Sequence, residues 1–455
     1  MFANFTFAQT SEKEIVNTLI TTYNEKNFSA FYQLLSPGFK TQMSEIDLKG
    51  FLSENVYKFY GNIKSVDFKR QKQNQKFYKT IFEKGEVELM LIFNDTFKID
   101  GLSLVPPKAE IVLRKEIISD NKMESALDKI IDSIAKTHIL NTKNVGFSIG
   151  IIKDGKTFFY HYGEIVRESK KLPNINTIYE IGSITKTFTG FLLAQAVNDK
   201  KINLDDDIRK YLPQKYPNLE FIKKPILIKH LVSHTSSIAR IPNDLDKQPN
   251  YDPLNPYANY SKTMVYNYLK TINLTAEPGT KQDYSNTGMA LLGIILENIY
   301  GKSYEQLLQM FMLKPFQMQT TFQNVPENME LNFAQGYNQE GQLTPHWDLG
   351  VQVGAGGIKS SVLDMTTFLN ENIKASNGTI KKSHEITFQN EKNTAGYAWV
   401  IQKMKNGDTL FWHNGGTYGF TSFYGFIREN NCGIVVLNNS GNRVDNVAIS
   451  ILKNL

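Results

Sequence analysis

The chain has 455 residues, of which 41% are hydrophobic, 12% aromatic and 21% charged. This composition is typical of a folded globular protein and excludes a chain that is mainly disordered or collagen-like. The net charge of +6 comes from Lys and Arg residues that occur at most in pairs, so we expect no nucleic-acid partner. The apolar runs are shorter than the ~18 residues of a transmembrane helix, so we expect no membrane span.

The N-terminal residues and the cysteine content bear on where the protein functions. Residues 1–10 include Phe7-Ala8-Gln9, a pattern typical of a bacterial signal-peptide cleavage region. We interpret them as the remnant of a signal peptide, which predicts a periplasmic or secreted protein; a frayed terminus is the alternative. The single cysteine, Cys432, excludes an internal disulfide framework and a multi-cysteine metal site.

Residues 11–107 predict a small α+β domain. Helical spacing of apolar residues comes first, and aromatic and β-branched runs typical of strands follow. The predicted helices are 15–23, 31–35 and 48–60, and the predicted strands are 77–82, 87–93 and 97–104. We expect the helices to pack on one face of a curved antiparallel sheet. This order of elements resembles the cone-shaped NTF2-like domains that are often fused to bacterial enzymes.

After a linker at residues 108–122, a second domain is predicted over residues 123–455. It begins with a helix near 123–140 and contains strands at both of its ends. The predicted strands are 145–152, 157–162, 408–413, 421–427 and 433–437. Long helical patterns lie between the two groups of strands. We therefore expect an antiparallel sheet assembled from both ends of the domain and flanked by helices, with an all-helical region inserted, in the α+β or α/β class.

The first chemical motif is Ser183-Ile184-Thr185-Lys186, followed by a long apolar helix. A serine and a lysine three residues apart on a helix lie on the same face, so the amine can reach the hydroxyl. If the turn is buried, desolvation lowers the lysine pKa and a neutral amine can accept the serine proton. The same spacing occurs without a following apolar helix in three further pairs, Ser119/Lys122, Ser133/Lys136 and Ser450/Lys453.

Two further motifs accompany the Ser-Lys pair. Tyr284-Ser285-Asn286 precedes an apolar helix, and its phenol and amide can relay protons and hold a substrate carbonyl. We favour it over the Tyr-x-Asn triplets at Tyr60, Tyr216 and Tyr257, which lie in the first domain or beside prolines. His413-Asn414-Gly415-Gly416 ends an apolar strand, where glycines allow a substrate to approach the backbone N–H groups of an oxyanion hole.

In this order, the three motifs resemble those of the serine β-lactamase and penicillin-recognising enzyme superfamily. The similarity is to its class C-like branch, which includes D,D-peptidases and family VIII esterases, and it covers most of residues 123–455. Two further stretches, 226–236 and 354–360, resemble signature segments of the same branch. The resemblance implies a β-lactamase/transpeptidase-like fold and a hydrolase that needs no metal or other cofactor.

The resemblance also implies a role for each motif residue. Ser183 would be the nucleophile and Lys186 its base, and Tyr284 would protonate the leaving group and help to activate water. Asn286 would orient the acyl amide, and the backbone N–H groups of Ser183 and Gly416 would form the oxyanion hole. Gly415 would line the substrate site.

The third motif departs from the family pattern. His413-Asn414-Gly415 stands where β-lactamases usually have Lys-Thr-Gly, so a fixed cation is replaced by a group that is largely neutral at pH 7. Efficient penicillin hydrolysis is therefore not expected. With an ordinary imidazole pKa of ~6.5, we expect His413 to gain charge, and to bind carboxylates better, as the pH falls through that value.

Other candidate sites have simpler interpretations. His230 and His234 are four residues apart, but no third zinc ligand is evident, so structural packing is favoured. The glycines of 354–357 predict a tight active-site turn rather than a phosphate cradle, because no strand-to-helix G-x-G-x-x-G frame surrounds them.

We therefore predict a serine hydrolase that forms an acyl-enzyme on amide or ester bonds, most similar to a D,D-peptidase or β-lactamase. Its partner would be a small-molecule or peptide substrate, such as cell-wall peptide. The alternatives are a carboxylesterase or D-aminopeptidase that uses the same residues, and a non-catalytic binding module with a penicillin-recognising fold.

Overall fold

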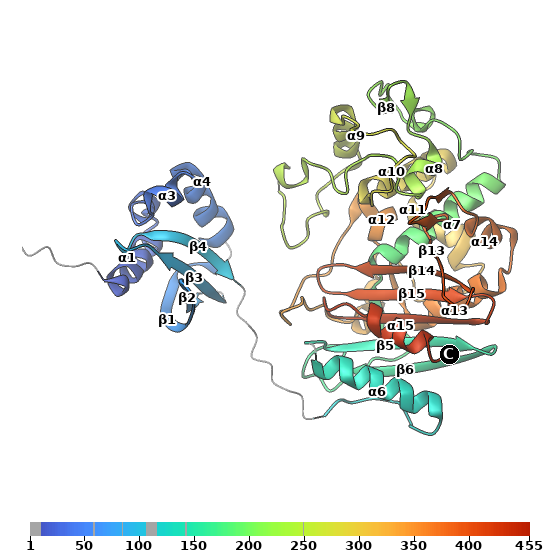
Figure 1. Ribbon diagram of the computed structural model, residues 1–455, viewed down its shortest axis with the longest axis horizontal. Coiled ribbons are helices and arrows are strands. Elements are labelled where there is room, and N and C mark those ends of the chain that lie inside the picture. Colours follow the sequence, from blue (N-terminus) through green and yellow to red (C-terminus); the bar gives the residue numbers. More distant parts are fainter. Residues whose placement is uncertain (1–10, 58–59, 84, 106–115, 142, 249) are drawn as a thin grey trace, which may run out of the picture. The chain divides into compact units, whose positions relative to one another are not determined.

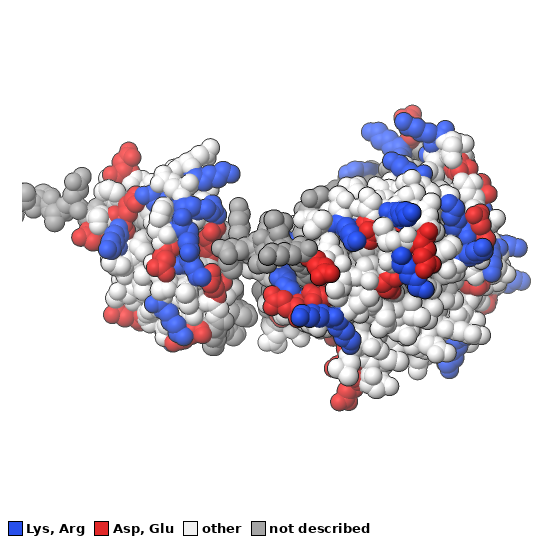
Figure 2. Space-filling model, turned by 90° about the horizontal axis from the view of Figure 1, so that it is seen from below, with Lys and Arg blue, Asp and Glu red and all other residues white. Residues whose placement is uncertain are grey.

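The computed structural model describes residues 11–455 apart from 58–59, 84, 106–115, 142 and 249. The signal-peptide interpretation of residues 1–10 therefore lies outside the described residues. The chain divides into two compact units, Met1–Glu110 and Ile111–Leu455, which are described separately below. Figure 2 shows Lys and Arg interspersed with Asp and Glu on the face that it presents.

The first unit contains short helices followed by a four-stranded antiparallel sheet (Figure 1). Ser11 begins the first helix with a capping box, because its side chain accepts from Glu14 N–H and Glu14 accepts from Ser11 N–H. The helices are α1 (Glu12–Asn24), α2 (Phe28–Tyr32), α3 (Pro37–Lys40), α4 (Glu45–Gly50) and the π-helix η1 (Phe51–Tyr57). The strands, in sheet order, are β1 (Ile63–Lys72), β2 (Gln75–Phe82), β3 (Glu86–Phe93) and β4 (Ile99–Val105).

Apolar side chains from these helices and strands form one core, which includes Leu19, Phe31, Leu89 and Ile99. Three of the four strands were predicted from their aromatic and β-branched runs. Strand β1 was not predicted, because it has a mostly polar sequence and lies at one edge of the sheet, where it pairs with β2.

The second unit is built on an eight-stranded antiparallel sheet with the order β11-β12-β13-β14-β15-β16-β5-β6. Its strands come from both ends of the unit, as predicted. Strand β16, near the end of the chain, pairs with β5, near the start of the unit (Figure 1). The strands are β5 (Gly146–Lys153), β6 (Lys156–Gly163), β11 (Phe388–Gln389), β12 (Thr394–Ala395), β13 (Val400–Lys403), β14 (Thr409–Gly416), β15 (Thr421–Ile427) and β16 (Cys432–Asn438).

Helices cover the sheet and fill the region between its two groups of strands. One apolar cluster joins α6 (Ala126–Asn141) and α15 (Asp445–Leu452) to the sheet through residues such as Ile131, Ile149 and Ile451. A larger cluster holds the helical region, which comprises α7 (Thr185–Asn198), η3 (Ile208–Tyr211), α8 (Ile228–Val232), η4 (Leu245–Lys247), α9 (Lys262–Thr271), α10 (Asn286–Tyr300), α11 (Tyr304–Leu308), η5 (Gln309–Leu313), η6 (Glu327–Asn332), η7 (Gly350–Gln352), α12 (Val353–Gly356), α13 (Val362–Lys374) and α14 (Gly378–Ser383).

Two small two-stranded sheets complete the unit. They pair β7 (Ile178–Glu180) with β10 (Lys359–Ser361), and β8 (Glu220–Phe221) with β9 (Lys224–Pro225). The stretch 108–122, interpreted as a linker, is described only from residue 116 onward. There it bonds to β6, since Ile118 O accepts from Gly163 N–H at 2.9 Å. Within the described part of the chain, no helix is both long and apolar enough to cross a membrane.

Candidate active site

The Ser183–Lys186 turn lies directly after β7. Ser183 is in the 3₁₀ helix η2 (Gly182–Ile184), and Lys186 is in the first turn of α7. Gly182 has a left-handed φ of +50°, and a Cβ on it would lie 2.6 Å from the Gly416 backbone nitrogen. A residue with a side chain would therefore be both strained and in collision there. This glycine brings the Ser183 turn against the end of β14.

Lys186 is fully buried, and its Nζ lies 3.0 Å from Ser183 Oγ. The amine also donates to the carbonyl oxygen of Ala355. Burial is the main cause that holds the lysine pKa well below its usual value, and the positive charge of Arg240 lowers it further. A neutral amine beside a half-buried serine hydroxyl can accept the proton of that hydroxyl.

Tyr284 is in the loop before α10, and its ring centroid lies 4.7 Å from Lys186 Nζ. Burial raises the pKa of its phenol to about 12, although a hydrogen bond with Ser183 and the charge of Arg240 oppose the increase. The phenol therefore keeps its proton at neutral pH. It can donate that proton to a group bound at Ser183.

Asn286 begins α10, directly after the N-cap residue Ser285. Its Oδ1 is buried and, among the described residues, has no hydrogen-bond partner. A buried acceptor without a partner is costly, so a substrate N–H is a fitting donor for it. Asn286 lines a small cavity with Ser183, Gly416 and residues from several loops.

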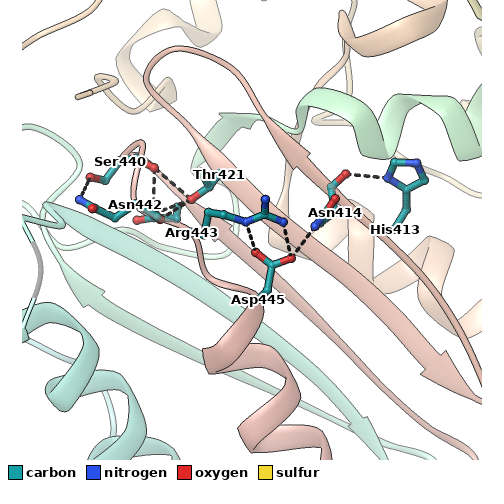
Figure 3. Close-up of polar contacts among 8 residues, drawn as sticks. His413, Asn414, Thr421, Ser440, Asn442, Arg443 and Asp445 are labelled. Carbon is teal, nitrogen blue, oxygen red and sulfur yellow. Dashed lines mark hydrogen bonds and ion pairs between the residues drawn. The ribbon is translucent and has the colours of Figure 1, made fainter. Parts of the chain in front are cut away.

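The third motif ends strand β14 beside the nucleophile turn. A Cβ on Gly415 would lie 2.0 Å from the Ile181 carbonyl oxygen, so only glycine allows this approach. The Asn414 side chain, in contrast, donates to Asp445, which also pairs with Arg443 at 2.9 Å (Figure 3). This network attaches the end of β14 to the start of α15. Together, these contacts hold the backbone of the third motif in place next to Ser183.

The structure thus brings Ser183, Lys186, Tyr284, Asn286 and the third motif into one site. The family model described as Beta-lactamase matches residues 127–452, which is most of the chain. The chain belongs to the beta-lactamase family.

Relatives of known sequence and structure share this part of the chain. Protein flp of Staphylococcus aureus (strain N315) is 29% identical over 334 residues, which cover 70% of this chain and 64% of that protein. The chain thus spans a little less than two thirds of the length of the first curated relatives that it matches. The octameric penicillin-binding protein homologue from Pyrococcus abyssi is 28% identical, with a TM-score of 0.64, over 72% of this chain and 77% of that one.

A third comparison concerns the fold alone. The beta-lactamase/D-alanine carboxypeptidase from Pseudomonas syringae is 23% identical, with a TM-score of 0.63. The match covers 72% of this chain and 99% of that chain. The beta-lactamase fold predicted for the second domain is therefore confirmed.

His413 occupies the third motif, and the structure corrects one expectation for it. His413 is 4% exposed, and burial together with the nearby Lys186 lowers its pKa to about 4. The expectation that it gains charge near pH 6.5 was wrong, because the sequence does not show this burial. Its Nδ1 lies 2.6 Å from Asn414 O (Figure 3). Since a carbonyl only accepts, Nδ1 carries the proton and Nε2 of the neutral ring is an acceptor.

The other serine-lysine pairs of this beta-lactamase family member differ from Ser183–Lys186 in burial. Lys136 is 44% exposed and pairs with Asp132 at 2.9 Å, and Lys122 and Lys453 are exposed. None of these three amines is in an environment like that of Lys186, whose side chain is completely buried.

Three residues near the site were not predicted to belong to it. Tyr257, set aside as a competing Tyr-x-Asn triplet, lines the cavity beside Ser183. His234, assigned to packing, lies with its ring centroid 4.3 Å from that of Tyr284 and accepts from Ser285 N–H at 3.2 Å. The guanidinium of Arg240 lies 4.8 Å from the Tyr284 ring centroid. The signature stretch 226–236 could have pointed to His234, and the Tyr-x-Asn triplet could have pointed to Tyr257. No local signal marks Arg240.

Two further expectations concern metal binding and backbone shape. The described residues contain no cluster of acidic, histidine or cysteine side chains that could hold a metal ion. His230 instead accepts from Leu227 N–H at 3.1 Å, at the start of α8. The glycine-rich segment 354–357, expected to be a tight turn, forms most of the short helix α12, which presents the Ala355 carbonyl oxygen to Lys186.

Proposed function

We propose that the protein is a serine hydrolase that forms an acyl-enzyme on Ser183. The observation that carries this proposal is the contact of Ser183 Oγ with the completely buried Lys186 Nζ at 3.0 Å. Desolvation lowers the pKa of this amine well below its usual value, which favours the neutral form that can act as a base. The exposed lysines of the other serine-lysine pairs lack this property.

In the proposed acylation, Ser183 Oγ attacks the carbonyl carbon of an amide or ester while Lys186 takes the hydroxyl proton. The backbone N–H groups of Ser183 and Gly416 stabilise the negative charge that develops on the carbonyl oxygen. Tyr284 gives its proton to the leaving group and is reprotonated from Lys186. The C–O or C–N bond then breaks and leaves an ester on Ser183.

In the proposed deacylation, a water molecule attacks the ester carbonyl and gives a proton to the Tyr284–Lys186 pair. The same pair returns a proton to Ser183 Oγ as the acid product leaves. Asn286 uses its unpaired Oδ1 to accept from an amide N–H of the acyl group during both steps. Every proton transfer in these steps occurs among Ser183, Lys186, Tyr284, the leaving group and the attacking water.

For the substrate, we propose acyl donors of the D-alanyl peptide or β-lactam type. Related proteins carry the names Beta-lactamase and Beta-Lactamase/D-Alanine Carboxypeptidase, which motivates this choice. Simple carboxylic esters are the alternative, because His413 is neutral at pH 7 and provides no cation for a carboxylate.

A substrate panel tests the proposal. The wild type is assayed with a D-alanyl-D-alanine peptide, a chromogenic cephalosporin and a nitrophenyl ester, alongside Ser183→Ala and the control Ser133→Ala. We expect turnover of at least one substrate that is lost in Ser183→Ala and kept in Ser133→Ala, because Ser133 is exposed on α6. Binding without turnover of any acyl donor would instead favour a non-catalytic module.

We also propose that the first unit is an NTF2-like accessory domain and that the protein is periplasmic or secreted. Helices followed by a four-stranded antiparallel sheet around one apolar core support the first statement. The family match begins at residue 127, outside this unit, so the unit supplies none of the proposed catalytic residues. Turnover of a small ester should therefore depend on the second unit alone.

A further inference from the structure

A cavity of about 580 Å³ lies in the helical region of the second unit, at the end of α9 (Figure 1). This volume is in the range of sites that bind small molecules, roughly 300–1,000 Å³. The cavity shares no lining residue with the cavity that holds Ser183. We call it the α9 cavity, and its walls are three segments of the chain, within residues 237–247, 268–276 and 281–283.

Hydrogen bonds hold the walls of the α9 cavity in place. The carbonyl oxygen of Ala239, in the first wall, accepts from Ser285 Oγ–H at 2.9 Å, and Ser285 lies two residues beyond the third wall. Asp244, also in the first wall, accepts from the phenol of Tyr260 at 2.8 Å, and Tyr260 lies two residues before α9. The walls are therefore fixed relative to one another before a ligand binds, which lowers the entropic cost of binding.

The α9 cavity combines apolar and neutral polar surface. Three of its lining side chains, Ile238, Tyr268 and Ile272, are buried and provide an apolar floor. Around this floor are neutral polar side chains that are exposed or half-buried and make no hydrogen bond with any described residue: Ser237, Asn243, Asn273 and Thr275. These hydroxyl and amide groups are therefore available to a ligand.

The charged side chains of the walls offer little to a ligand. Asp244 already accepts two side-chain hydrogen bonds, one on each carboxylate oxygen. Lys281 pairs with Asp283 at 3.7 Å, and both side chains are more than 70% exposed. Lys247 is exposed, so water and salt screen its charge. The ligand that fits these walls best is therefore neutral, with hydrogen-bonding groups and some apolar surface.

Saccharides have this combination, because hydroxyl groups surround the apolar face of the sugar ring. An acetamido group adds an N–H donor and a C=O acceptor, and an asparagine amide can bond to both. Its methyl group fits the apolar floor. We propose that the α9 cavity is a binding site for a neutral saccharide that carries acetamido groups. This site goes beyond the proposed function, since none of the residues with a role in acyl transfer lines it.

Isothermal titration calorimetry of the full-length protein tests the proposal. The ligand is the β-1,4-linked trisaccharide of N-acetylglucosamine, and the control ligand is the glucose trisaccharide with the same linkage, which has a hydroxyl in place of each acetamido group. We expect saturable binding of the first and binding of the second that is about tenfold weaker, because it lacks the hydrogen bonds of the acetamido groups.

Two changes in the walls should weaken binding of the acetamido trisaccharide. The double variant Asn243→Ala/Asn273→Ala removes two hydrogen-bonding side chains, so its affinity should fall about tenfold. Thr275→Trp places a large ring in the cavity and should abolish binding. All three residues are exposed, and their side chains make no hydrogen bond with the described residues, so these variants should fold as the wild type does.

Two further variants are controls. Asn176 is also exposed in the second unit, its side chain makes no hydrogen bond with the described residues, and it does not line the cavity, so Asn176→Ala should bind as the wild type does. Ser183→Ala should also keep the wild-type affinity for the saccharide, because this binding does not use the nucleophile. The measurement needs no turnover, so its outcome is independent of that of the substrate panel.

Three results would overturn the assignment. The first is an absence of saturable binding, or binding that both wall variants retain. The second is equal affinity for the two trisaccharides, which would mean that the acetamido groups are not recognised. The third is a loss of binding in Ser183→Ala with none in Thr275→Trp, which would place the saccharide in the Ser183 cavity instead.

Discussion

Replacing Lys186 with methionine separates its catalytic role from its structural role. Methionine keeps an unbranched apolar side chain in the buried position but lacks the amine that lies 3.0 Å from Ser183 Oγ. A positioned base contributes about 10²–10⁴ in rate, which is about 2.7–5.5 kcal/mol of the activation barrier. We therefore expect kcat/KM for a nitrophenyl ester to fall by about that factor in Lys186→Met.

The same substitution should leave the fold intact. It removes the hydrogen bonds of the amine to Ser183 Oγ and to the Ala355 carbonyl oxygen, each worth about 1 kcal/mol. It also removes the cost of burying an amine, so the free energy of unfolding should fall by no more than about 2 kcal/mol. Urea unfolding followed by circular dichroism measures this change.

The pH profile provides a second readout for Lys186. Its pKa is lowered, and the base is active only when deprotonated. Wild-type kcat/KM should therefore rise with pH through that lowered pKa and become level above it. Lys136→Met is the control, because Lys136 follows Ser133 at the same spacing but is 44% exposed. Turnover of Lys186→Met within threefold of wild type, or an equal loss in Lys136→Met, would refute the role assigned to the buried amine.

Three further predictions concern the proton donor, a buried carboxyl and a close backbone contact. Tyr284→Phe should lower kcat about 10²-fold or more in ester hydrolysis. Tyr216→Phe should not, because it removes a buried hydroxyl that has no partner among the described residues; the reverse order would contradict the assignment. Burial raises the pKa of Glu180 to about 7 from 4.5, so the folded protein binds this proton more tightly than the unfolded chain does. The free energy of unfolding of the wild type should therefore fall by about 3 kcal/mol as the pH rises from 4.5 to 7, and this fall should be absent in Glu180→Gln. Gly415→Ala should lower the melting temperature and kcat, because its Cβ would lie 2.0 Å from a carbonyl oxygen, while Gly378→Ala, with no atom within 4 Å, should change neither.

Elements with strong local patterns were predicted well from the sequence. Strand β15 was predicted with the bounds that it has, 421–427, because aromatic and β-branched residues fill it and every one of its residues is buried. Strand β1 was missed, because it lies at a sheet edge and most of its side chains are partly or fully exposed. A solvated edge strand needs no apolar run, so its sequence resembles that of a loop.

The candidate site was predictable where its geometry is local. Ser183 and Lys186 are one turn apart, so their contact follows from helical spacing. Arg240 and Tyr257 reach Tyr284 and the cavity through loops, which only the packing of α10 and its neighbours brings together. The low pKa of His413 was also outside the reach of the sequence, since it depends on burial of the ring next to Lys186.

Mass spectrometry of the intact protein and its peptides after reaction with a fluorophosphonate or a slowly hydrolysed β-lactam tests the central claim most directly. We predict one covalent adduct, on the peptide that contains Ser183, and none on the peptides that contain Ser119, Ser133 or Ser450. The adduct should be absent in Ser183→Ala and should form much more slowly in Lys186→Met. An adduct on any of the other three serines, or undiminished labelling of Ser183→Ala, would contradict the account.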